Sequence, residues 1–197
     1  MTVFSTRSYR SMIRSFRLFL TLMFCFALNT MAVAESEIQY AEIVLTEEGY
    51  VVNADIDLKL NARLIEVVNR GVPLHFIAEF QIEQPRWYWL NRDVVERTIE
   101  YRLVYHTITR SYRLSIGTLH RSFDTIDEAI RTMSRIRNWK VASPDALQAG
   151  VSYNAALRFR HDTAMLPKPF QVTAIGSRDW NLATDWMTWT FLAGAIR

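Results

Sequence analysis

Apolar and polar side chains alternate with a period of two along residues 151–160. The apolar set is Val151, Tyr153, Ala155, Leu157 and Phe159. Because successive side chains of a β-strand point to opposite faces of a sheet, this period predicts a strand with one buried and one solvent-facing side. The same period recurs over residues 52–60, 74–82, 99–105 and 112–116. One wet face on each strand favours antiparallel sheets over a parallel sheet buried on both faces.

Turn residues separate these strands. Gly49 lies in a predicted hairpin turn between strands at about residues 38–46 and 50–60, and residues 106–110 join two further strands. Pro85 is expected to end the strand that begins at Leu74, since proline cannot donate to the ladder of a sheet.

Two segments have the spacing of helices. Asn61 is a candidate N-cap for an apolar stripe that stops at Gly71. A capping box begins at Thr125, and the apolar residues after it predict a helix as far as about Asn138. These observations predict a mainly β fold, an antiparallel two-sheet, sandwich-like domain with two short helices.

The first 34 residues have the three parts of a secretory signal peptide. Four arginines precede the apolar run Leu18–Leu28, and Ala32-Val33-Ala34 matches an A-x-A cleavage site. We therefore expect a signal peptide at residues 1–34, a single β-rich domain at residues 35–197, and a periplasmic location.

An uncleaved membrane anchor is the alternative reading of the same segment. The run is about half the length of roughly 20 apolar residues that a spanning helix needs, which favours cleavage. Lipidation at Cys25 is rejected because the preceding Met23 and Phe24 are large. Residues 186–196 are apolar but too short to span a membrane.

Charge is distributed unevenly along the chain. The whole sequence has a net charge of +3, but removal of the four N-terminal arginines leaves 19 basic and 20 acidic side chains. This balance does not indicate nucleic-acid binding. Residues 35–96 have a net charge of −7 and residues 97–140 one of +5. The two segments either neutralise each other side by side or present opposite patches to a partner.

Catalytic motifs are missing from the sequence. The four histidines form no metal-binding pair, and there is no nucleophile elbow, P-loop or dinucleotide turn. We therefore expect no enzyme activity, no catalytic residue, no cofactor and no metal. Asp55 and Asp57 lie on one face of a predicted strand and could serve as a pair of carboxylates for hydrolysis, but a solvated strand has the same pattern.

Six residues are candidates for binding a partner. Arg86, Trp87 and Trp89 belong to an aromatic tetrapeptide that could stack on a sugar or anchor a protein, although core tryptophans of a β-protein are the favoured reading. Lys168 lies in Leu166-Pro167-Lys168-Pro169-Phe170, which we expect to be a stiff turn before a strand at residues 171–175. Arg131 and Arg135, four residues apart, could form the basic face of the second helix, facing an acidic partner or anionic lipid, although a solvated helix face is the favoured reading.

The chain also resembles a proteobacterial family of secreted proteins, the domain of unknown function numbered four-three-nine-zero. The matching pieces cover most of the chain after the signal: Arg70-Gly71-Val72-Pro73-Leu74, Arg86-Trp87-Tyr88-Trp89, Leu103-Val104-Tyr105, Thr109-Arg110, Asp127-Glu128-Ala129 and Leu166-Pro167-Lys168-Pro169-Phe170-Gln171. The resemblance implies an exported protein without assigned activity or catalytic residues. The resemblance also implies a gene next to that of a membrane sensor histidine kinase, which is a hint of partnership only.

The function expected from the sequence is a periplasmic binding or protein-interaction module without a catalytic site. It could act as an accessory to a membrane sensor kinase. An envelope hydrolase or sugar-active enzyme that uses the strand carboxylates and aromatic residues is the alternative.

Overall fold

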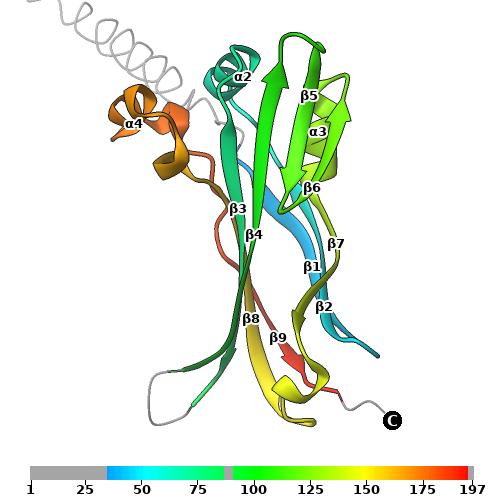
Figure 1. Ribbon diagram of the computed structural model, residues 1–197. Helices are drawn as coiled ribbons and strands as arrows, with labels where there is room; N and C mark the ends of the chain where they lie inside the picture. The colour runs from blue at the N-terminus through cyan, green and yellow to red at the C-terminus, as the bar shows by residue number, and fades with distance from the viewer. Residues whose placement is uncertain (1–34, 87–90, 195–197) are drawn as a thin grey trace, which may run out of the picture. The chain divides into compact units, whose positions relative to one another are not determined.

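Two antiparallel sheets form the fold of the computed structural model, which describes residues 35–86 and 91–194. The larger sheet has the order β6-β5-β4-β3-β8-β9 and the smaller one the order β1-β2-β7 (Figure 1). The strands are β1 Glu37–Thr46, β2 Gly49–Asp57, β3 Leu74–Gln84, β4 Arg92–His106, β5 Ser111–Ile116, β6 Leu119–Phe123, β7 Arg135–Ala142, β8 Ser152–His161 and β9 Met187–Leu192. The predicted mainly β, two-sheet, sandwich-like fold is confirmed.

The hydrophobic core lies between the two sheets. In β8 the alternation has the predicted result, since Tyr153, Ala155, Leu157 and Phe159 are all buried. Aromatic rings join the layers: Phe80 of β3 lies edge-on to Trp139 of β7, with ring centroids 5.9 Å apart. In β3, inside the larger sheet, every second residue from Leu74 to Ile82 is buried.

Helices carry the chain from one sheet to the other. Helix α2, Ala62–Asn69, leads from β2 to β3, and helix α3, Ile126–Met133, leads from β6 to β7. Both predicted caps are confirmed. The side chain of Asn61 accepts a hydrogen bond from the Leu64 amide at 2.9 Å, and that of Thr125 accepts one from the Glu128 amide at 3.3 Å.

The second helix is shorter than predicted. It ends at Met133, with Ser134 as its C-cap, and Arg135 already belongs to β7. The predicted extension to Asn138 was wrong. Ile136 has the helical spacing of Ile130 and Met133 in the sequence, but in the structure it belongs to a strand and points into the core. The Ser134 carbonyl accepts a hydrogen bond from the Ile56 amide, which ties this point to the end of β2.

The predicted strand at residues 171–175 is also wrong. This segment forms helix α4, Lys168–Ala174, which begins after Pro167 and carries Pro169 in its first turn. Proline is accepted there because the first amides of a helix have no partner within the helix. Three 3-10 turns complete the fold: η1 Pro144–Ala146, η2 Thr163–Met165 and η3 Arg178–Trp180. In the described part of the chain, no helix is long and apolar enough to cross a membrane.

Candidate binding surfaces

The structure separates the residues that the sequence had grouped. Arg131 lies on α3, Arg135 begins β7 and Lys168 begins α4, and all three side chains are exposed. Arg86 is exposed after the end of β3, whereas Trp87 and Trp89 lie outside the described residues. The expected basic face of Arg131 and Arg135 on one helix therefore does not exist, because the helix ends between them.

The two strand carboxylates are both held in ion pairs. Asp55 contacts Arg137 of β7 at 2.5 Å, and Asp57 contacts Lys59 at 3.0 Å. The Asp55–Arg137 pair joins the acidic and basic segments of the chain, so here the two segments do neutralise each other. Neither aspartate lines any of the pockets described below.

A pocket of about 310 Å³ lies beside α3 and the end of β6. Its walls carry two guanidinium groups that come from different elements, Arg121 from β6 and Arg131 from α3. The guanidinium of Arg121 lies over the ring of Phe123, 5.1 Å from its centroid. The remaining lining residues are polar: Ser122, Asp124, Glu128 and Thr132.

The two arginines of this pocket have no carboxylate partner within the described part of the chain. Other cations form the ion pairs found there, namely Lys59, Arg63, Arg70, Arg137 and Arg160. Glu128 lies in the first turn of α3, where the positive end of the helix dipole favours an acid. The pocket therefore offers two exposed guanidiniums to a ligand, beside an aromatic ring.

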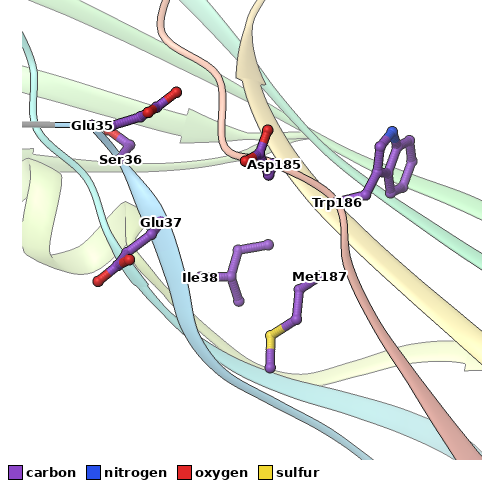
Figure 2. A pocket seen from close by; sticks show the side chains of 7 residues that line it. All are labelled: Glu35, Ser36, Glu37, Ile38, Asp185, Trp186 and Met187. Atoms are coloured by element: carbon purple, nitrogen blue, oxygen red, sulfur yellow. The ribbon is translucent and has the colours of Figure 1, made fainter.

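A second pocket, of about 330 Å³, lies between the start of β1 and the segment that leads into β9. Figure 2 shows the side chains of Ile38 and Met187 in the space between the two strands, with Trp186 pointing away. Three carboxylates also line this pocket: Glu35, Glu37 and Asp185. It combines an apolar floor with acidic walls.

The outer face of the larger sheet carries charged groups that bind one another. Arg160 of β8 contacts Glu79 of β3 at 2.8 Å and Asp162 at 3.8 Å. Partial burial, and secondarily the nearby Arg102 guanidinium, lower the pKa of His75 on the same face. On this surface the charges of Arg160, Glu79 and Asp162 are therefore paired with one another.

Comparison with known proteins places the chain in a family. The family model described as Domain of unknown function (DUF4390) matches residues 33–190. The chain belongs to this family. No curated protein and no solved structure matches the chain. The DUF4390 match covers every strand and helix described above except the end of β9.

Sequence reasoning found one of the two pocket arginines. Arg131 was predicted from the charge of its helix, but Arg121 and Phe123 were not singled out. Their strand, β6, is a short edge strand with four of its five residues exposed, so it lacks a clear alternation. The one usable signal was the basic excess of residues 97–140, which includes both arginines.

Proposed function

We propose that this DUF4390 chain is an exported binding module that docks on an acidic segment of an envelope protein. The observation that carries the proposal is the pair Arg121 and Arg131, which share one pocket and have no carboxylate partner among the described residues. The N-terminal segment with signal-peptide features supports export. The module acts by binding and performs no covalent chemistry.

The chemistry of the pocket favours a carboxylate ligand. A guanidinium is always charged and presents a planar fork of donors that matches the two oxygens of a carboxylate. Two such forks in one pocket can bind two acidic side chains, or one acidic side chain and a backbone carbonyl. The ring of Phe123 holds the Arg121 side chain in place and adds an apolar contact.

Asp124 and Glu128 set the range over which the pocket attracts a ligand. At long range their two negative charges offset the two positive charges of the arginines, so the pocket does little to steer a distant acidic partner toward itself. Recognition then depends on direct contact, which gives specificity for a segment that fits the pocket. A periplasmic or membrane-bound partner is expected, and the gene-neighbourhood hint makes a sensor kinase one candidate.

Capture from an envelope extract tests the proposal. Purified protein is compared with the double variant Arg121→Glu, Arg131→Glu, and captured proteins are identified by mass spectrometry. A matched control carries Arg110→Glu and Lys140→Glu, two exposed positions of the same basic segment that lie outside the pocket. Both double variants change the net charge equally, so a general electrostatic effect would weaken both.

The proposal predicts one recurring partner that the wild type and the control capture and the pocket variant does not. Equal capture by both double variants would contradict it. Turnover of envelope substrates by the purified protein at ordinary enzymatic rates would also contradict it, and would favour the hydrolase alternative.

A further inference from the structure

We propose that the outward side of α4 docks on the surface of a lipid bilayer. The docking surface consists of Met165 on η2 and Val172, Ile175 and Lys168 on or next to α4. This inference rests on observations separate from the pocket beside α3, and it concerns the segment that follows β8 and not β6 or α3.

Helix α4 has an inner and an outer side. Phe170 and Ala174 pack against the core, and the Phe170 ring lies 5.7 Å from that of Trp180. Lys168, Val172 and Ile175 follow at spacings of four and three residues, which places them on the side opposite Phe170. The inner contacts fix the helix, so the outer side chains face away from the protein.

The outer side chains are far more exposed than apolar groups usually are. Val172 is 73% exposed, Ile175 is 82% exposed and Met165 is 55% exposed. They belong to η2, α4 and the residue that follows α4, and exposed apolar side chains gathered in one short segment are typical of interaction sites. Figure 1 shows α4 beside α2 at one end of the sheets, with β9 ending toward the other.

The charge of this segment suits a bilayer surface. Residues 163–178 contain no aspartate or glutamate, although the chain has 20 acidic residues in all, and they include Lys168 and Arg178. A lysine beside apolar side chains can extend its ammonium group to lipid phosphates while its methylene stem stays in the apolar layer. A carboxylate at the same place would oppose insertion.

The place where the N-terminal segment joins the domain gives the second argument. Ser36 is buried and accepts a hydrogen bond from the Lys59 amide, two residues before Asn61. The Asn61 amide group donates to the Asp179 carbonyl at 2.7 Å, next to the Trp180 that supports α4. The chain therefore enters the fold at the end that carries α4.

The segment outside the structure has 34 residues, including four arginines and the apolar run Leu18–Leu28. Whenever this run is in a membrane, during export or as a retained anchor, the entry point is held near that membrane. The α4 surface then lies within reach of the same bilayer. One short helix supplies modest affinity, so this proximity favours its insertion.

Site-specific fluorescence in the full chain tests the inference. The single cysteine, Cys25, is replaced by serine, and a polarity-sensitive dye is attached at a cysteine introduced by Val172→Cys or Ile175→Cys. Matched controls carry the dye at Leu119→Cys beside the β5–β6 turn or at Leu192→Cys at the end of β9, which are 76% and 69% exposed. Leu192 pairs with Ser152, at the end of β8 opposite to the one that leads into η2 and α4. The probes are vesicles of phosphatidylglycerol and phosphatidylcholine in equal parts, with or without spin-labelled lipid.

The inference predicts that spin-labelled lipid quenches the dye at residues 172 and 175 and leaves the dye at residues 119 and 192 unquenched. Lys168→Glu should reduce the quenching in these vesicles. Absence of quenching at residues 172 and 175, or equal quenching at all four sites, would overturn it. A blue shift at residue 172 that rises with protein concentration without vesicles would instead assign the patch to a second copy of the chain.

Discussion

His161 donates a hydrogen bond from Nδ1 to the carbonyl oxygen of Trp180, 2.9 Å away. A carbonyl oxygen only accepts, so Nδ1 must carry the proton and Nε2 is left as a bare acceptor. Nε2 is buried with no hydrogen-bond partner among the described residues. The imidazole ring also packs against Phe76, with ring centroids 5.3 Å apart. Burial therefore lowers the pKa of His161, because a second N–H would have no acceptor in this place.

This arrangement predicts a loss of stability in mild acid. A histidine in the unfolded chain has a pKa of about 6.5, and in the folded chain the pKa of His161 is lower. The unfolded state therefore binds more protons below that pH, so the stabilising contribution is complete above about pH 6.5 and is lost as the pH falls. The free energy of unfolding, measured in urea at several pH values, should decrease from pH 7.5 toward pH 5 by a smaller amount in His161→Gln than in wild type.

The exposed His120 on β6 provides the control for this experiment. The decrease in His161→Gln should also be smaller than that in His120→Gln. His75 contributes in the same direction as His161, since burial and Arg102 also lower its pKa. An unchanged pH dependence in His161→Gln would show that the buried imidazole does not govern acid stability.

Gly49 lies where a side chain would collide with the backbone of β7. Its φ is +128°, and a Cβ atom there would lie 2.3 Å from the Ala142 carbonyl oxygen of β7. Gly49→Ala should therefore lower the free energy of unfolding by about 3 kcal/mol or more, from strain and overlap together. Gly150 has φ of +78° but open space around it, so Gly150→Ala should cost only about 1–2 kcal/mol of strain. Equal losses in the two variants would contradict the close approach.

Asn61 has two separable roles. Its Oδ1 atom caps α2, and its Nδ2 atom donates to the Asp179 carbonyl and so links α2 to η3. Asn61→Ala should cost about 1 kcal/mol for the cap and a further amount for the link. Asn61→Asp keeps the cap and loses only the link, so thermal or urea denaturation should find it more stable than the alanine variant. The reverse order would mean that the cap contributes little.

The strands that the sequence identified are those whose two faces differ strongly. In β3 and β8 one face is in the core and the other faces solvent, so a period of two survives in the sequence. In β7 it does not, because the register against β2 shifts between Val52 and Ala54 and Asn138 takes a φ of +49°. Two residues there face one on the partner strand, which hides the strand inside an apparently helical pattern.

The binding surfaces were harder to predict than the sheets. The prolines around Lys168 were interpreted as a turn, whereas they start a helix, and only the surrounding contacts with Trp180 decide between these outcomes. Arg121 and Arg131 are ten positions apart and meet only because α3 packs beside β6. A single sequence shows which residues are charged, but it does not show which of them the fold brings into one pocket.

Photo-crosslinking at the pocket beside α3 tests the central claim most directly. A photoreactive amino acid replaces Ser122, which lines the pocket, or Glu47, which is exposed on the β1–β2 turn at the end of the smaller sheet far from α3, and the protein is irradiated in living cells. The account predicts a crosslinked partner at residue 122, none at residue 47, and loss of the product when Arg121→Glu and Arg131→Glu are added. A product at residue 122 that survives both charge reversals, or a partner captured only at residue 47, would contradict it.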